Sequence, residues 1–321
     1  MAMDSYKFGP YKIDDKEVFF KSHLSYAMVN LRPVLPGHIL FLMKREVKRF
    51  VDLTADETTD LWITAQRVGG QLESYHKASS LTFTIQDGPQ AGQTVPHVHI
   101  HIIPRKVGDF ENNDDIYDAI DKNDKELKEK LDLDKERKDR SFEEMAQEAE
   151  EYRKLFLKDP PNMDMEELFY TFGPHKISSN DVFYTTHLSF AFVNLRPVLP
   201  VHVLVCPKRE VKRFADLTID ETNDLWTIAH KICAPLQTYH KASSLTFTIQ
   251  DGPQAGQSVA HVHIHIVPRK VGDYERNDDI YDAIDDNDKK LKQNMDLDIE
   301  RKDRSPEERA QEAEEYRKIF L

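Results

Sequence analysis

The chain has 321 residues, of which 39% are hydrophobic, and carries a formal net charge of -13. This length suffices for two globular cores, whereas the charge disfavours non-specific binding to nucleic acid or to an anionic membrane surface. No apolar run is long enough to span a bilayer, the start MAMDSYKFGP lacks the features of a secretory signal, and only two cysteines occur. We therefore expect a protein of a reducing, cytoplasmic compartment without a disulfide framework or a thiolate zinc site.

The sequence repeats itself at a constant offset of 164 residues, which aligns His99 with His263 without a gap. Residues 75–93 are identical to residues 239–257, so a whole domain is duplicated rather than a short solenoid unit. We predict a first domain over residues 4–156, a linker over 157–168 and a second domain over 169–321. Pro160 and Pro161 lie in the linker, where they interrupt the preceding helical pattern.

Strands are predicted in the first copy over residues 18–20, 24–30, 38–43 and 81–85, where aromatic and aliphatic residues gather between turn signals. A helix begins after Thr54, which forms a capping-box pattern with Glu57 and precedes apolar residues at helical spacing. A final helix is predicted from Ser141. In the second copy Pro235 falls inside the helical pattern, which predicts that this helix kinks or ends early.

The stretch QDGPQAGQTVPHVHIHIIPR at residues 86–105 returns at residues 250–269 as QDGPQAGQSVAHVHIHIVPR. Because side chains alternate along a strand, His97, His99 and His101 point to one face at a spacing of roughly 6.5 Å, while the intervening apolar residues point into a core. The glycines before the first histidine allow backbone N–H groups to approach an anion. A strand lined by histidines therefore meets a loop suited to phosphate.

This arrangement suits transfer of a phosphoryl group. An uncharged imidazole is a good nucleophile, and the phosphorus–nitrogen adduct that it forms can be cleaved by water in a second step. The central histidine of each triplet is the natural nucleophile, with its neighbours and the loop amides stabilising charge on the phosphate oxygens.

Two other interpretations of the histidines stay open. A histidine on a strand is commonly a hydrogen-bonded structural residue, and His-x-His is a common zinc-ligand pattern. Asp87 is the only nearby carboxylate and no cysteine is close, so the glycine loop favours phosphate over metal. Asn30 and His38 fit a turn or core as well as a site.

The repeated sequence HVHIHI resembles the motif of the histidine triad superfamily, and the segments YAMVNLRPVLPGHILF, SLTFTIQDGPQAGQTV and PRKVGDFENNDDIYDAI resemble its fragile histidine triad branch. The resemblance covers nearly the full chain, twice. It implies an α+β fold of two domains, each an antiparallel sheet with two helices, packed as an intramolecular pseudo-dimer. Gln86 and Gln250 stand where the sister branch of purine nucleoside phosphoramidases usually has Asn.

The resemblance assigns a role to each matching histidine. It implies that His99 and His263 are the nucleophiles, that His101 and His265 contact the substrate phosphates, and that His97 and His261 support the central imidazole.

The resemblance also implies the other substrate contacts. Asn30 and Asn194 match the ribose-contact position, and Tyr11 and His175 match a position near the nucleoside that is usually His, from which Tyr11 departs. The positions implied to bind the phosphate chain are Gln86, Gly92, Gln93, Thr94 and Val95 in the first copy, and Gln250, Gly256, Gln257, Ser258 and Val259 in the second. Between the copies Gly37 becomes Val201 and Thr94 becomes Ser258, neither of which removes a reacting group.

The resemblance finally implies hydrolysis of a dinucleoside polyphosphate, diadenosine triphosphate above all, to AMP and ADP through a nucleotidyl-histidine. It implies no protein-bound cofactor or metal, with Mg²⁺ or Mn²⁺ arriving with the substrate, and a monomer that acts as an internal dimer. Tyr117 and Tyr281 resemble a regulatory tyrosine position. The alternatives are a nucleotide-bound signalling module with slow turnover, a phosphoramidase of the sister branch and a metal-binding structural domain.

Overall fold

The computed structural model describes residues 6–30, 33–110, 168–194 and 197–273. The first copy contains the strands β1 (Tyr6–Phe8), β2 (Tyr11–Ile13), β3 (Val18–Lys21), β4 (Ser25–Val29), β5 (Ile39–Met43), β6 (Ser80–Asp87) and β7 (His99–Arg105), with helix α1 (Ala55–Tyr75) between β5 and β6. The second copy repeats this with β8 (Phe169–Phe172), β9 (His175–Ser178), β10 (Val182–Thr185), β11 (Ser189–Val193), β12 (Val203–Pro207), β13 (Ser244–Asp251), β14 (Ile264–Arg269) and helix α4 (Ile219–Tyr239).

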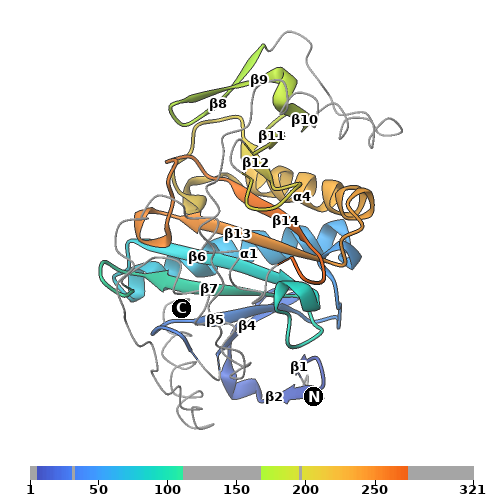
Figure 1. The fold of residues 1–321 in the computed structure, drawn as a ribbon. Coiled ribbons are helices and arrows are strands. Elements are labelled where there is room, and N and C mark those ends of the chain that lie inside the picture. The colour runs from blue at the N-terminus through green and yellow to red at the C-terminus, as the bar shows by residue number, and fades with distance from the viewer. Residues whose placement is uncertain (1–5, 31–32, 111–167, 195–196, 274–321) are drawn as a thin grey trace, which may run out of the picture.

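The two copies share one antiparallel sheet of ten strands, in the order β10-β11-β12-β14-β13-β6-β7-β5-β4-β3. The copies join at its centre, where β6 pairs with β13 and Thr84 lies opposite its own equivalent Thr248. This register makes the two halves nearly symmetric about that point. The hairpins β1–β2 and β8–β9 lie at opposite ends of the molecule (Figure 1). The predicted α+β pseudo-dimer is therefore confirmed.

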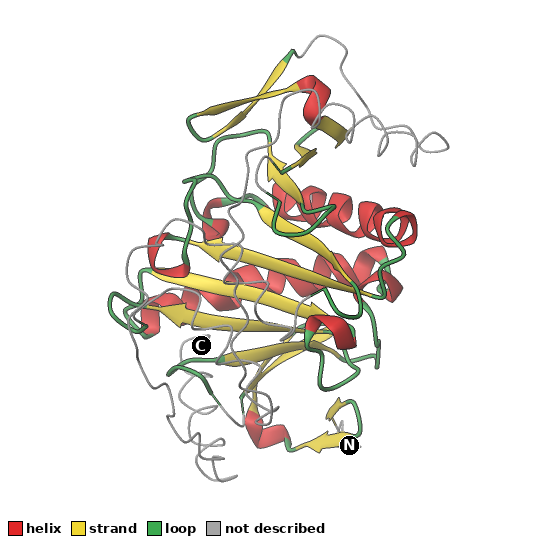
Figure 2. Cartoon of the chain, in the orientation of Figure 1, coloured by secondary structure: helices red, strands yellow, loops and turns green. Residues whose placement is uncertain are grey.

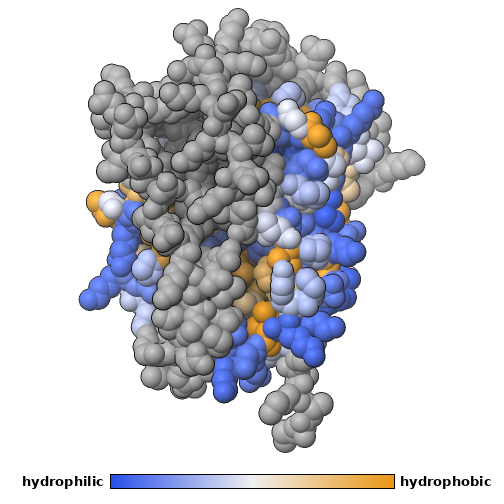
Figure 3. Space-filling model, turned by 60° about the horizontal axis from the view of Figure 1, so that its bottom comes forward, coloured by the Kyte–Doolittle hydropathy of each residue, from blue (hydrophilic) through white to orange (hydrophobic). Residues whose placement is uncertain are grey.

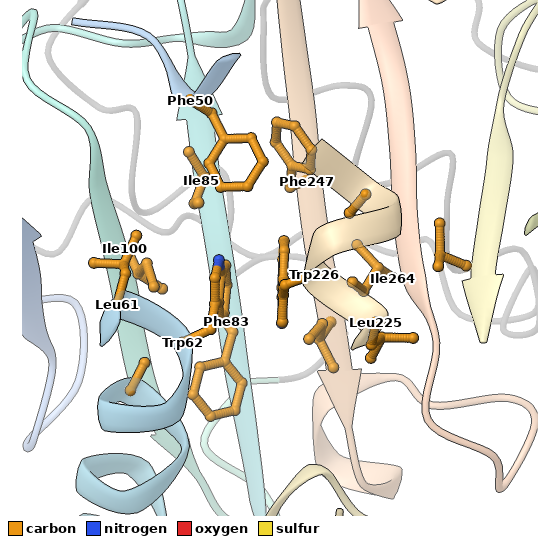
Figure 4. Close-up of a cluster of buried hydrophobic side chains, with 14 of the residues drawn as sticks. Phe50, Leu61, Trp62, Phe83, Ile85, Ile100, Leu225, Trp226, Phe247 and Ile264 are labelled. Carbon is orange, nitrogen blue, oxygen red and sulfur yellow. The ribbon is translucent and has the colours of Figure 1, made fainter. Parts of the chain in front are cut away.

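Helices α1 and α4 pack side by side against one face of the sheet (Figure 2). The buried core between them and the sheet includes Phe83, Ile100 and Phe247. At its centre the rings of Trp62 and Trp226, equivalent residues of the two copies, stack at 3.4 Å with an interplanar angle of 9° (Figure 4). Burial of such large aromatic side chains stabilises the contact between the copies as well as each copy itself.

The predicted start of each helix is confirmed. For the second helix a kink or an early end was predicted at Pro235, and the early end is wrong. Thr54 and Glu57 form a complete capping box at the start of α1. Helix α4 continues past Pro235 to Tyr239 and has the same 21 residues as α1. Proline removes one helical N–H bond, yet Ile232 and Leu236 on either side of it are fully buried. Their packing holds the helix together across the proline.

The predicted strands are confirmed to within a few residues at their ends. The helix predicted from Ser141 and the linker up to residue 167 lie outside the described residues, so the domain bounds stay a prediction. In the described part of the chain, no helix combines the length and the hydropathy needed to cross a membrane. Figure 3 shows that the described residues visible from that side are mainly hydrophilic, with hydrophobic side chains in small separate groups.

Candidate active site

The histidines lie on the face of the sheet opposite the helices. Along β7 the apolar residues Ile100 and Ile102 point into the helix-side core, so His99 and His101 point to the other face. A smaller cluster covers that face, with Leu40 and Leu42 from β5 and Tyr6 from the β1–β2 hairpin. The side chains of the triplet are consequently buried, with His97 at 0% and His99 at 4% exposure.

His97 is held by two backbone groups. The Gly9 N–H in the β1–β2 turn donates to its Nδ1 at 3.2 Å, so Nδ1 is unprotonated and Nε2–H donates to the Met43 carbonyl at 3.0 Å. Gly9 has φ +55°, and a Cβ there would lie 2.7 Å from Val95. Glycine thus allows the hairpin to close over the histidine.

His99 is positioned as a neutral nucleophile. Its Nδ1 lies 2.7 Å from the His97 carbonyl, which only accepts, so Nδ1 carries the proton and Nε2 keeps its lone pair. Burial lowers the pKa of His99 to about 4, so the imidazole is uncharged at neutral pH. The ring of Phe8 packs edge-on against it with the centroids 4.9 Å apart.

His101 is oriented by His38, whose role the sequence left open. The Val34 N–H donates to His38 Nδ1 at 3.1 Å, so the other nitrogen, Nε2, carries a proton and donates to His101 Nδ1 at 3.0 Å. The remaining proton of His101 is therefore on Nε2, which is buried and has no hydrogen-bond partner among the described residues. The hydrogen bonds from Val34 through His38 thus fix His101 so that it presents an N–H donor on the same face as the His99 nucleophile.

The second copy reproduces this geometry. His261 accepts from Gly173, His263 Nδ1 lies 2.7 Å from the His261 carbonyl, and His202 Nε2 lies 2.9 Å from His265 Nδ1. Burial lowers the pKa of His263 to about 4. Both copies therefore hold a complete set of site histidines.

Gln86 and Gln250 are the next-to-last residues of the strands beside the triplets. β6 pairs with β7 so that Thr84 lies opposite His101; continued by two residues, this register places Gln86 beside His99 on the same face. Gln86 is buried, and Gln250 is its equivalent on β13. The side-chain amide nitrogen of Gln250 is buried without a hydrogen-bond partner in the described part of the chain. Such an orphaned donor, like that of His265, fits a site for an anion.

The loop between Gln86 and His97 does not offer its N–H groups to an anion over residues 88–93 as predicted, because these groups donate to acceptors of the protein itself. Gly88 and Gly92 have φ +98° and +89°, which only glycine adopts without strain. The side chain of Gln93 closes the loop, because its oxygen accepts from the Gly88 N–H and its nitrogen donates to the Lys48 carbonyl. Thr94 is exposed and Val95 half-buried at the end of the loop. Contacts of these residues and their equivalents with phosphate stay a prediction.

The residues that the resemblance implies as nucleoside contacts are half-buried or exposed. Asn30 is half-buried, and its side-chain amide lies 3.1 Å from His38 Nε2; since this nitrogen is protonated, the amide turns its oxygen toward it. The amide of Asn194 lies 3.3 Å from His202 Nε2. Tyr11 is 59% exposed on the β1–β2 hairpin. His175 is exposed on β9, the equivalent strand. Tyr117 and Tyr281 lie outside the described residues.

Arg105 lies at the end of the histidine strand, where a cation could attract phosphate, but its guanidinium binds both carboxylate oxygens of Asp109, at 2.9 and 3.1 Å. Its charge is therefore already paired. The triplet also does not converge as metal ligands do, because both ring nitrogens of His97 face backbone groups. Among the residues that the structure describes, no cluster of three His, Cys, Asp or Glu could hold a metal ion.

Matches to known proteins fall on each of the two copies. The family model described as HIT domain matches residues 12–108 and again residues 176–272. A bifunctional bis(5′-adenosyl)-triphosphatase/adenylylsulfatase FHIT of Arabidopsis thaliana is 71% identical over 152 residues, which cover 47% of this chain and 84% of the relative. A bis(5′-adenosyl)-triphosphatase of Dictyostelium discoideum is 53% identical over 149 residues, 46% of this chain and 91% of the relative. An asymmetrical bis(5′-nucleosyl)-tetraphosphatase of Schizosaccharomyces pombe is 40% identical over 164 residues, 44% of this chain and 90% of the relative.

Each of these relatives aligns with less than half of the chain, which is about the length of one copy. The family model, in contrast, matches both copies over the segment that carries the histidine strand. The chain therefore belongs to the HIT family, the histidine triad proteins, and carries two HIT domains in tandem.

Proposed function

We propose that each domain hydrolyses a dinucleoside polyphosphate, with diadenosine triphosphate as the preferred class of substrate, to AMP and ADP. The observation that carries the proposal is the hydrogen bond from His99 Nδ1 to the His97 carbonyl. It leaves Nε2 of a buried, neutral imidazole as the free nucleophile. The names of the relatives from Arabidopsis and Dictyostelium, which share 71% and 53% of aligned residues, support this substrate.

The reaction has two displacements. In the first, His99 Nε2 forms a bond to the α-phosphorus, the bond from that phosphorus to the bridging oxygen breaks, and ADP leaves. The imidazole of the adduct is positively charged because Nδ1 keeps its proton, and the His97 carbonyl stabilises that proton at 2.7 Å. In the second, water attacks the same phosphorus, the bond from phosphorus to Nε2 breaks, AMP and one proton are released, and the neutral imidazole returns.

His101 and Gln86 stabilise the charge that develops during both steps. The Nε2–H of His101, fixed by His38, donates to an oxygen of the transferring phosphoryl group. Gln86, beside His99, donates from its side-chain amide. The backbone N–H groups of Thr94 and Val95, which follow the loop, bind the rest of the phosphate chain. The charge left on the phosphate chain would be neutralised in part by Mg²⁺ or Mn²⁺ bound to the substrate.

A second candidate substrate is adenylyl sulfate, which the name of the Arabidopsis relative suggests. It carries the same adenosine 5′-phosphoryl group, joined to sulfate in place of ADP. The same attack by His99 would release sulfate and form the same adduct, so the site needs no further residue for this reaction.

We propose in addition that the chain works as a monomer. The pairing of β6 with β13 joins the two domains within one chain, so no second copy is needed to complete the sheet.

Cys206 and Cys233 are free and buried, which supports a reducing, cytoplasmic compartment.

Replacement of His99 and His263 by Asn, singly and together, tests the function. Each single variant should keep about half of the rate of AMP and ADP release from diadenosine triphosphate, and the double variant should lose roughly a thousandfold or more. Denatured protein stopped during turnover should carry AMP on His99 or His263. A double variant as active as the unmodified protein contradicts the assignment.

The same assay separates the alternatives. Tight binding of diadenosine triphosphate with very slow release of products would favour the signalling module. Faster cleavage of adenosine 5′-phosphoramidate than of diadenosine triphosphate would favour the phosphoramidase. Adenylyl sulfate, run in parallel, tests the second candidate.

A further inference from the structure

The loop that precedes each histidine strand is held by the opposite domain. We call residues 88–93 loop 1 and residues 252–257 loop 2. β6 runs antiparallel to β13 with Asp87, its last residue, opposite Leu245. Loop 1 therefore begins beside the start of β13, next to Ser244 of the other domain. By the same register, loop 2 begins next to Ser80.

Gln90 is the residue of loop 1 that makes this contact. The hydroxyls of Ser243 and Ser244 both donate to its side-chain oxygen, at 2.8 and 2.9 Å. The Gln90 N–H in turn donates to the Ser244 hydroxyl at 3.1 Å. Ser244 is fully buried, so water cannot replace these bonds without rearrangement.

The contact is as close as the backbone allows. A Cβ added to Gly88 would lie 2.5 Å from the Ser244 hydroxyl and 3.1 Å from its Cβ. Arg49 links the same groups from the side, because it donates to the Ser243 carbonyl and to the Asp87 carboxylate, at 2.9 Å each. Loop 1 is thus fixed between its own domain and the start of β13.

Loop 2 has the matching contacts in reverse. Ser79 and Ser80 donate to the side-chain oxygen of Gln254 at 2.8 Å each, and the Gln254 N–H donates to the Ser80 hydroxyl at 3.1 Å. Arg213 donates to the Ser79 carbonyl at 3.2 Å. The chain therefore contains two equivalent contacts that cross between the domains in opposite directions.

From these contacts we infer that Ser244 and Ser80 are positioning residues that act across the domain boundary, Ser244 for the His99 site and Ser80 for the His263 site. The inference rests on the proposed function, in which Gln86 and the N–H groups of Thr94 and Val95 bind the phosphate chain. Loop 1 lies between these residues in the sequence, so its position sets where the phosphate lies relative to the His99 nucleophile. A small displacement of such a loop is sufficient to slow the chemical step.

The test uses protein with one working site. In His263→Asn only the His99 site turns over, and Ser244→Ala added to it should lower kcat/KM for diadenosine triphosphate by about tenfold, because the loop loses a buried anchor. The matched control is Ser80→Ala in the same background. Ser80 is equally buried and has equivalent bonds, yet it anchors loop 2, so it should change the rate less than about twofold.

The mirror experiment uses His99→Asn, in which Ser80→Ala should impair turnover and Ser244→Ala should not. Because the two serines are equivalent, both replacements should lower the midpoint of thermal unfolding by similar amounts, which separates positioning from general loss of stability. Gln90→Glu, which keeps an acceptor oxygen, should retain activity that Gln90→Met loses. Equal effects of both serines on one site, or no effect of either, overturns the inference.

Hydrogen exchange gives a result that does not depend on catalysis. Ser244→Ala should speed amide exchange in residues 88–93 and leave residues 252–257 unchanged, and Ser80→Ala should do the opposite. If the unmodified protein fails to cleave diadenosine triphosphate, the proposed function fails while this measurement still tests the contact. If cleavage occurs but exchange in loop 1 responds to neither serine, the inference fails alone.

Discussion

The chemistry of the site depends on which ring nitrogen of each histidine carries the proton. Of the four site imidazoles in the first copy, three have a backbone partner that fixes this: His97 through Gly9, His99 through the His97 carbonyl and His38 through Val34. His101 inherits its tautomer from His38. The nucleophile therefore presents a lone pair and its neighbour presents a proton, as attack on a phosphate requires.

His38 should accordingly be needed for the rate although it does not touch the reacting phosphorus. In the His263→Asn background, His38→Leu removes the donor to His101 Nδ1, and kcat should fall roughly tenfold, as is typical when the partner of a functional histidine is lost. His38→Gln, which offers an N–H, should recover part of that loss. The ¹⁵N chemical shifts of His101 report the tautomer directly.

The matched control for this prediction is His202→Leu in the same background. His202 orients His265 in the inactive site, so its loss should leave turnover at His99 nearly unchanged. A tenfold fall in both variants would mean that the imidazoles act only through the stability of the fold.

At the scale of single elements, the two long helices show how equivalent segments tolerate different residues. α1 contains Gly69 and Gly70 where α4 contains Cys233 and Ala234. A Cβ on Gly69 would lie 2.8 Å from the ring of Phe83, so a small residue fits best there. A Cβ on Gly70 would meet only the Cβ of Ala215, at 3.9 Å.

Gly70→Ala should therefore stabilise the protein. The added methyl group has room, and alanine in a helix is favoured over glycine by about 1 kcal/mol. Gly37→Ala is the contrasting variant, because Gly37 has φ +88° and a Cβ would lie 2.7 Å from the His76 ring. It should cost about 1–3 kcal/mol. Unfolding in urea measures both changes, and equal signs would contradict the prediction.

The turn at Gly37 also shows what differs between the copies. In the second copy the same position is Val201, which is buried and has φ +79°. A β-branched residue is strained in this region. The turn precedes His202, so the strain lies beside the histidine that orients His265. The two sites thus share their reacting groups but differ in the backbone strain of a neighbouring turn.

At the scale of the whole molecule, the sequence predicts those features that follow from local periodicity or from the repeat. The alternation of His97, His99 and His101 fixes their common face, and the offset between the copies predicts two equal domains. The pairing of Gln90 with Ser244 could not be predicted, because it depends on the register between β6 and β13. The role of His38 depends on the turn that brings Val34 to its ring, which periodicity does not describe. The sequence did contain one signal for these residues, since His38 and Gln90 are identical to their equivalents His202 and Gln254 in the second copy.

The buried histidines should make the whole protein sensitive to acid. Burial lowers the pKa of all six triplet histidines, to about 4 for His99 and His263, whereas an unfolded histidine has a pKa near 6.5. Between these values the unfolded chain binds more protons than the folded protein. The contribution of these histidines to the free energy of unfolding is therefore largest above about pH 6.5 and decreases as the pH falls toward 4. Each histidine loses about 1.4 kcal/mol for each unit by which folding lowers its pKa.

The variant with both His99 and His263 replaced by Asn isolates this contribution. It has two fewer groups to protonate, so its stability should fall less steeply between pH 6.5 and 4 than that of the unmodified protein. Burial raises the pKa of Asp87 and Asp251, which acts in the opposite direction, but both proteins share these residues. Urea unfolding at several pH values measures the two slopes. Parallel curves would show that His99 and His263 take up protons as readily in the folded protein as in the unfolded chain, and so that neither is held as the neutral nucleophile on which the mechanism depends.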